Sequence, residues 1–226
     1  MNSMIQPLIS LWDQAVSIWM SGGWAMIAIA AISLLMFSLG IHVYMKLASK
    51  QVDKVREQTW RHWIDHPDER EGYVGKVLNF VTGGKSLKDT AAFFEELRST
   101  EILPFERDLK VMKICASAAP LLGLLGTVTG MLATFSALAT GSGGDKTMES
   151  VASGISEALV TTETGLIIAL PGVFAHYILV RKLEKYKALL AHIETVCTQK
   201  QYKKLKRQKH SLLNIYSSIG AKKAAS

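Results

Sequence analysis

Apolar residues gather in three long runs along the chain, separated by polar and charged segments. The runs cover residues 24–45, 114–139 and 154–180. At a helical rise of about 1.5 Å per residue, each run exceeds the roughly 30 Å hydrocarbon thickness of a bilayer. Backbone polar groups must be satisfied within such a segment, which favours helices. The pattern therefore predicts an all-α membrane protein with three transmembrane helices.

The segment before the first run predicts an outer, periplasmic lead-in. Residues 1–23 contain no Lys or Arg, and the apolar run that follows is longer than the core of a secretory signal peptide. We therefore expect residues 24–45 to remain as a transmembrane helix. Apolar residues recur at helical spacing within the lead-in, which is typical of an amphipathic helix with interfacial tryptophans: Leu8, Leu11, Trp12, Ala15, Trp19 and Met20.

Basic residues predict the orientation of the three helices. The segments 1–23 and 140–153 together hold a single basic residue, Lys146, whereas basic residues cluster at the other end of every run. The positive-inside rule then places the amino terminus and the 140–153 connection in the periplasm. The 46–113 loop and the 181–226 tail are expected in the cytoplasm.

Both expected cytoplasmic segments carry helical periodicity. The loop predicts helices over 52–63, 73–80 and 87–113, with breaks at His66-Pro67 and Gly83-Gly84. The last of these is expected to run into the second span, interrupted only by Pro104. The apolar spacing after residue 180 predicts a long helical extension, with fraying expected from Lys203 onward.

Composition narrows the function classes. The net charge is +7, and 12 of the 26 basic residues lie in 181–226. Without a nucleic-acid motif, this charge favours membrane lipids or an acidic partner rather than nucleic acid. Cys115 and Cys197 complete no metal set, and no nucleophile-base pair is present. We expect no enzyme, no cofactor and no metal site.

The second span has two faces when drawn as a helix. One carries small residues and threonines, among them Gly123, Gly126, Thr127 and Gly130, and the other carries leucines and Phe135. Small residues let helices approach closely in a membrane. Thr127 could serve packing alone, since its hydroxyl can bond to its own preceding turn, or it could have a further role. Pro120 is expected to loosen the helix.

The third span holds polar groups that a lipid-facing helix would avoid. Glu157 and Glu163 lie in a run with Thr161, Thr162 and Thr164. A carboxylate at bilayer depth costs a few kcal/mol and usually has a function. Because these side chains point to several sides of the helix, the third span needs protein or water around it. The short 140–153 connection makes the second and third spans antiparallel neighbours.

Two motifs in these spans resemble a known family. APLLGLLGTVTGM at Ala119–Met131 and GISEALVTTETGLIIALPGV at Gly154–Val173 are similar to the signature helices of the ExbB/TolQ/MotA family, with the strongest resemblance to ExbB. The resemblance implies a homo-pentameric ring in the bacterial inner membrane, whose second and third spans line a channel. It further implies two copies of a single-span ExbD-like partner, and a TonB-like protein that receives the mechanical work.

The resemblance also assigns roles to single residues. It implies that Thr127 and Thr162 face the channel and that Glu157 is the membrane glutamate. Apart from the resemblance, we expect Pro120 and Pro171 to take part in helix packing with the three glycines. Glu163 departs from the family pattern, which has a small residue there. This carboxyl could bind a proton, assist a hydrated sodium ion, or remain neutral and bond to a neighbouring subunit, so the coupling ion stays open.

Three functions remain open at this point. The first is an ExbB-like stator that passes the energy of an ion gradient to TonB for outer-membrane import. The second is a TolQ-like or MotA-like stator for another machine. The third is a passive membrane scaffold whose polar residues only hold helices together.

Overall fold

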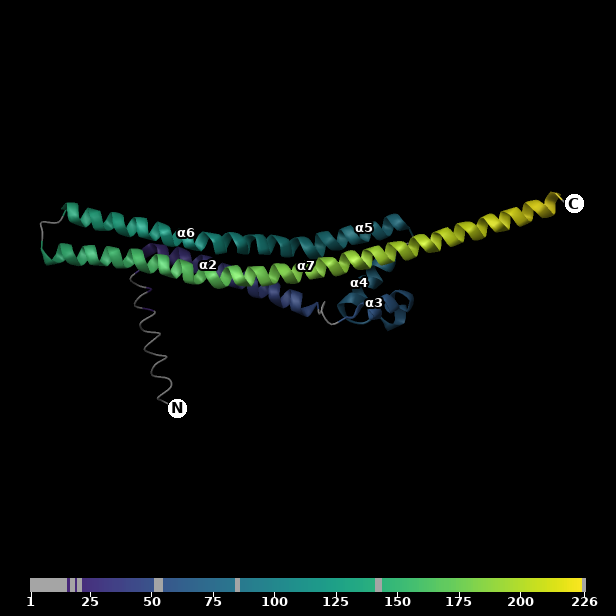
Figure 1. The fold of residues 1–226 in the computed structure, drawn as a ribbon, viewed down its shortest axis with the longest axis horizontal. Coiled ribbons are helices and arrows are strands. Elements are labelled where there is room, and N and C mark those ends of the chain that lie inside the picture. The colour runs from purple at the N-terminus through teal and green to yellow at the C-terminus, as the bar shows by residue number, and fades with distance from the viewer. Residues whose placement is uncertain are drawn as a thin grey trace, which may run out of the picture. The chain divides into compact units, whose positions relative to one another are not determined.

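The computed structural model describes residues 16, 19, 22–50, 55–83, 86–140 and 144–224. The expected lead-in therefore lies almost entirely outside the described residues. Every element in the described part of the chain is helical (Figure 1). The elements are α2 (Gly23–Ser49), α3 (Glu57–Asp65), η2 (Pro67–Glu69), α4 (Gly72–Thr82), α5 (Leu87–Leu97), η3 (Arg98–Ile102), α6 (Leu103–Thr140) and α7 (Asp145–Ala224).

The chain forms two compact units. Unit 1 comprises Met1–Tyr44 and Arg107–Val180, and unit 2 comprises Met45–Glu106 and Arg181–Ser226. Three helices among the described residues are long and apolar enough to cross a membrane: α2, the stretch that ends with α6, and the first part of α7. The predicted all-α class with three apolar spans is therefore confirmed.

Unit 1 packs α2, α6 and α7 along narrow stripes and leaves much apolar surface exposed. On α2, Met26, Ile29 and Met36 are buried, whereas Ile27 and Leu34 are largely exposed. A helix that is apolar on every side is suited to lipid or to further helices around it. Unit 1 therefore presents apolar faces beyond those that its own three helices cover.

Close approach of α6 and α7 depends on residues without side chains. Figure 1 shows the two helices side by side along unit 1. A Cβ atom at Gly165 would lie 2.7 Å from the carbonyl oxygen of Ala119, and one at Gly123 would lie 2.9 Å from that of Thr161. A Cβ at Gly130 would likewise lie 2.7 Å from the carbonyl oxygen of Gly154. Backbone meets backbone at these points, as in other membrane helix pairs built on small residues.

Unit 2 is a small helical bundle with its own core. The largest buried side chains include Trp60 of α3, Leu78 of α4, Phe94 of α5 and Ile193 of α7. The chain reverses between α3 and α4 at Pro67, and Gly72 starts α4 with φ of 66°. Ser86 and Asp89 form a capping box that starts α5, which satisfies two backbone donors.

Helix bounds differ from the sequence expectation in three places. α3 begins at Glu57, whereas the sequence predicted a start at residue 52. Residues 51–54 lie outside the described part, and the described residues 55 and 56 are not helical. α7 begins at Asp145, so much of the 140–153 connection is helical, with an acidic residue in the first turn that suits the positive helix end. α7 also continues to Ala224, so the stretch after Lys203 is helical, and the expected fraying of this end stays a prediction.

Helix is continuous from Leu87 to Thr140, as expected, but it changes form before Pro104. Residues Arg98–Ile102 make a π turn, η3, in which the Leu103 N–H donates to the Arg98 carbonyl. Proline lacks an N–H and its ring crowds the carbonyl four residues earlier. The wider π turn accommodates this defect and, as π turns do, rotates the side chains around it.

Gly165→Ala tests the close approach of α6 and α7. The added methyl group meets the Ala119 carbonyl, and the overpacking should cost about 1–3 kcal/mol, more than the gain of up to about 1 kcal/mol in helix propensity. We expect a lower thermal unfolding temperature for the detergent-solubilised protein. Gly83→Ala is the matched control, because its nearest atoms would lie 3.6 and 3.7 Å away. A Gly165→Ala protein as stable as the control would contradict the packing.

Candidate functional site

Hydroxyl groups of α7 bond to the backbone of α6 at a single level of the interface. Thr161 has no exposed surface; its hydroxyl lies 3.5 Å from the Gly123 carbonyl of α6 and also bonds to the carbonyls of Glu157 and Ala158 in its own helix. Thr162 donates to the Gly123 carbonyl across the interface at 3.1 Å. Gly123 and Gly126 carry no side chains that would block this approach. The interface thus buries hydroxyls only where each finds an acceptor, as a low-dielectric site requires.

Thr127 lies one turn along α6 from Gly123. Its side chain is half-buried, and its hydroxyl donates to the Leu124 carbonyl at 2.7 Å. This is the bond to the preceding turn that the sequence allowed. Because Thr162 contacts Gly123, Thr127 and Thr162 lie at neighbouring levels of facing helices, with part of each side chain still accessible.

Glu157 lies against the first turn of α2. A Cβ atom at Gly23 would overlap the Glu157 carboxylate, and Gly23 has φ of 62°, a backbone conformation that favours glycine. The start of a helix carries unpaired N–H groups and partial positive charge, which favours a carboxylate. The sequence predicts that Glu157 lies deep within the bilayer. In the structure it lies near one end of the apolar helices, beside the first residue of α2.

Glu163 lies away from this interface. Its side chain is exposed in the single chain, in the same part of α7 as the exposed Leu159 and Leu170. The structure therefore groups Thr161 and Thr162 at the α6 contact, places Glu157 beside α2, and leaves Glu163 on an uncovered face.

The two expected helix-packing prolines differ in setting. Pro120 lies half-buried within α6, whereas Pro171 is exposed within α7. The neighbouring Gly172 makes the close contact instead, against Met36 of α2. Thr161, which has no exposed surface, was not predicted from sequence as a site residue. Its position one turn after Glu157, on the same side of the helix, could have indicated that it is buried.

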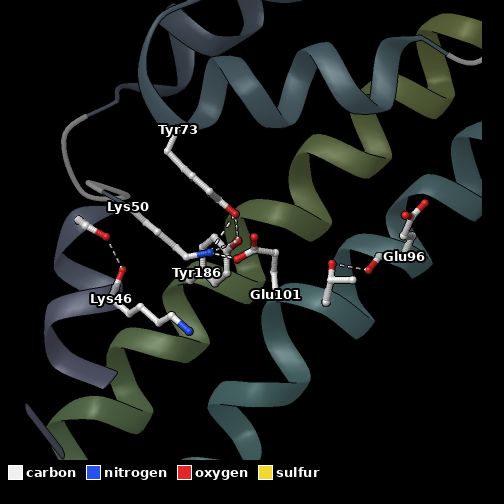
Figure 2. Close-up of polar contacts among 8 residues, drawn as sticks. Lys46, Lys50, Tyr73, Glu96, Glu101 and Tyr186 are labelled. Atoms are coloured by element: carbon white, nitrogen blue, oxygen red, sulfur yellow. Dashed lines mark hydrogen bonds and ion pairs between the residues drawn. The ribbon is translucent and has the colours of Figure 1, made fainter. Parts of the chain in front are cut away.

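Unit 2 contains a buried ammonium group enclosed by aromatic rings. Figure 2 shows Lys50, which follows α2, reaching toward Tyr73 of α4, Glu101 of η3 and Tyr186 of α7. The Lys50 Nζ donates to the Tyr73 hydroxyl at 3.0 Å and the Tyr186 hydroxyl at 3.5 Å, and it forms an ion pair with Glu101. The two tyrosine hydroxyls are 2.5 Å apart. We call these four residues the Lys50 cluster.

Aromatic faces complete the enclosure of the charge. The ammonium lies 4.3 Å from the Tyr73 ring centroid, 5.0 Å from that of Tyr186 and 5.4 Å from that of Phe105. Lys50 is only 8% exposed, whereas the Glu101 side chain is 36% exposed. Burial and the hydrogen bond with Tyr73 raise the pKa of Tyr186 far above its usual value, so its hydroxyl stays neutral. Cation–π contacts and the ion pair together replace the water that Lys50 loses.

The Lys50 cluster was not predicted from sequence. In the sequence Lys50 is one of several basic residues after the first span, and these indicate only the orientation of the helices. Its partners are distant in the chain, and Glu101 reaches it from the π turn, for which the sequence carries no strong signal.

Comparisons with known proteins place the chain in a family. A sequence profile of the MotA/TolQ/ExbB proton channel family matches residues 69–192. The chain is 36% identical over 124 residues to the Tol-Pal system protein TolQ of Haemophilus influenzae, covering 48% of this chain and 54% of that protein. It is 34% identical over 121 residues to the biopolymer transport protein exbB1 of Vibrio cholerae, covering 53% and 51%. It is 32% identical over 145 residues to the biopolymer transport protein ExbB of Pseudomonas putida, covering 64% and 42%.

The profile covers more than half of the chain, including all of α6 and the part of α7 that carries the threonines. The chain therefore belongs to the MotA/TolQ/ExbB proton channel family. It spans about half the length of the curated relatives it matches.

Lys50→Met tests the Lys50 cluster. The substitution keeps the length of the side chain but leaves the Glu101 carboxylate and two hydroxyls without their cation, which should cost about 1–3 kcal/mol. We expect faster amide hydrogen exchange in residues 87–106 of the full-length protein. Lys76→Met, at an exposed lysine of α4, should leave exchange unchanged. Equal exchange in both variants would show that the cluster contributes nothing to unit 2.

Proposed function

We propose that this chain is a stator subunit in the bacterial inner membrane, which with an ExbD-like partner turns an ion-motive force into mechanical work passed to a TonB-like protein. Membership of a proton channel family supports this proposal, and so do the relatives whose names describe biopolymer transport. The observation that carries it is the Thr162 hydroxyl bonded to the Gly123 carbonyl. It gives one wall of the proposed channel a polar group within two apolar helices.

The proposed assembly is a homo-pentamer that holds two copies of the single-span partner. α6 and α7 would line the channel and α2 would lie outside them. The exposed apolar faces of unit 1 support an assembly, since they offer surface for neighbouring copies and for lipids. In this ring Thr127, Glu157 and Thr162 would lie along the ion path, and Glu163 would contact the next copy or the path.

The proposed topology follows the distribution of basic residues. The amino terminus and the α6–α7 connection would be periplasmic, and unit 2 with the end of α7 would be cytoplasmic. One elementary charge that crosses 100 mV releases about 2.3 kcal/mol. Passage of a few ions is therefore enough to turn one helix bundle against another.

A TolQ-like role is the second candidate function. It is favoured by the 36% identity to a Tol-Pal system protein, compared with 34% to the biopolymer transport protein exbB1. In that case the same ion-driven motion would serve the Tol-Pal system instead of a TonB-like protein. Co-purification with the partner encoded next to this chain separates the two roles.

Thr162→Val tests the stator function most sharply. Valine keeps the shape but removes the hydroxyl, so ion-driven work in cells that depend on this subunit should fall at least tenfold, about 1.4 kcal/mol. Thr162→Ser keeps the hydroxyl and should retain most of the activity. Thr127→Val, Glu157→Gln and Glu163→Gln extend the series, with sodium and proton gradients applied separately to identify the coupling ion.

Assembly must be measured in parallel by the size of the purified complex. A variant that assembles but does no work supports the stator. If all four substitutions preserve both assembly and membrane-potential-dependent work, the stator proposal fails and the passive scaffold explains the polar residues.

A further inference from the structure

Unit 2 has a polar cleft outside the Lys50 cluster. The cleft has a volume of about 810 Å³ and lies between the α3–α4 corner, the end of α4, the start of α5 and α7. Its lining includes three cationic side chains, Arg70, Lys200 and Lys204, against one carboxylate, Asp65. Amide and hydroxyl groups of Asn79, Thr82, Thr90 and Gln201 complete its polar wall.

Arg70 is fixed in this wall by neutral acceptors. Its guanidinium donates to the Trp63 carbonyl at 2.7 Å and the Ile64 carbonyl at 3.3 Å. It also donates to the Asn79 side-chain oxygen at 2.7 Å and the Thr82 hydroxyl at 2.9 Å. All four acceptors are uncharged, so the guanidinium is held rigidly while its positive charge acts on the cleft.

Lys200 and Asp65 show that the cleft accepts a carboxylate. The Lys200 Nζ lies 2.6 Å from the Asp65 carboxylate, and this hydrogen bond lowers the pKa of Asp65. Lys204 lies one turn further along α7, and no ion pair with a carboxylate is found for it in the described part of the chain. Three cationic side chains and one carboxylate line the cleft, so two positive charges remain after Asp65 offsets one.

The thiol of Cys197 lies on the wall of the same cleft. Burial raises the pKa of Cys197 to about 11, while Arg70 and Lys200 both act in the opposite direction. Both cations are therefore close enough to influence a side chain on the cleft wall, from opposite segments of unit 2.

The positive surface extends from the cleft along α7. The sequence has no Asp or Glu after Glu194. The exposed Lys203 and Arg207 lie three residues after the cleft residues Lys200 and Lys204, which places all four on one side of the helix. Cations that repeat every turn of a helix, about 5.4 Å apart, suit a ligand with several carboxylates in a row. Six like charges within 200–209 also oppose pairing of this segment with a second copy of itself.

We propose that this cleft and the adjoining face of α7 bind an acidic peptide segment of a partner protein, rich in Asp or Glu. One carboxylate of the peptide replaces Asp65 on Lys200, a second pairs with Lys204, and the following ones lie along Lys203 and Arg207. Arg70 supplies a fixed positive charge at the inner end. This binding site does not depend on the stator function and is tested without it.

The experiment measures the affinity of a fluorescein-labelled hexaglutamate peptide for the full-length protein in detergent, by fluorescence anisotropy. Lys204→Glu reverses a charge in the cleft and should weaken binding about tenfold. Asp65→Asn removes the competing carboxylate and should strengthen binding several-fold. Lys76→Glu and Asp68→Asn make the same charge changes at exposed positions outside the cleft lining and should alter affinity by less than about twofold.

The opposite signs expected for Lys204→Glu and Asp65→Asn exclude loss of folding as the common cause. The proposal is overturned if Lys76→Glu weakens binding as much as Lys204→Glu does, because net charge alone then explains the affinity. It is also overturned if Asp65→Asn fails to strengthen binding. Displacement of the probe by ATP or an RNA oligonucleotide at lower concentration than by unlabelled hexaglutamate would reassign the cleft to a phosphate ligand.

Discussion

The contact between the Thr162 hydroxyl and the Gly123 carbonyl is the interaction on which unit 1 depends. It requires that α6 and α7 approach until their backbones touch, and glycine on both helices makes this possible. A hydroxyl within apolar helices is tolerated because its acceptor lies on the facing helix instead of in water. Close packing and polarity are linked here, because the glycines allow the approach that brings the Thr162 hydroxyl to its acceptor.

This feature suits a member of the MotA/TolQ/ExbB proton channel family. A polar group that already has an acceptor costs little in an apolar span, yet part of the Thr162 side chain remains accessible. The Glu157 carboxylate is accommodated differently, against the start of α2 at Gly23. The Thr162 hydroxyl and the Glu157 carboxylate of unit 1 thus lie at two levels, one within the α6–α7 interface and the other beside the α2 terminus.

Much of the fold could be predicted from the sequence because bilayer thickness and helical spacing leave few alternatives. The three apolar runs predicted the spans, and the stripe of small residues on α6 predicted the face that α7 contacts. The Lys50 cluster could not be predicted, because Lys50, Tyr73, Glu101 and Tyr186 share no local pattern and meet only through tertiary packing. The π turn and the side of α2 that receives Glu157 also depend on packing. Glu163 was identified from sequence, but a single chain gives it no partner among the described residues.

The central claim is that α6 and α7 pack backbone to backbone at their small residues. Its most direct test is a cross-link between Ala116→Cys and Gly172→Cys, in a protein whose two native cysteines are changed to serine. A Cβ atom at residue 172 would lie 3.6 Å from that of Ala116, within the separation found in disulfides, and its nearer neighbours are only the end of the flexible Met36 side chain. After oxidation in membranes and cleavage at a protease site inserted between residues 140 and 145, the two fragments should remain joined. Separation of the fragments, or equal cross-linking of Ala116→Cys with Leu170→Cys on the exposed face, would contradict the account.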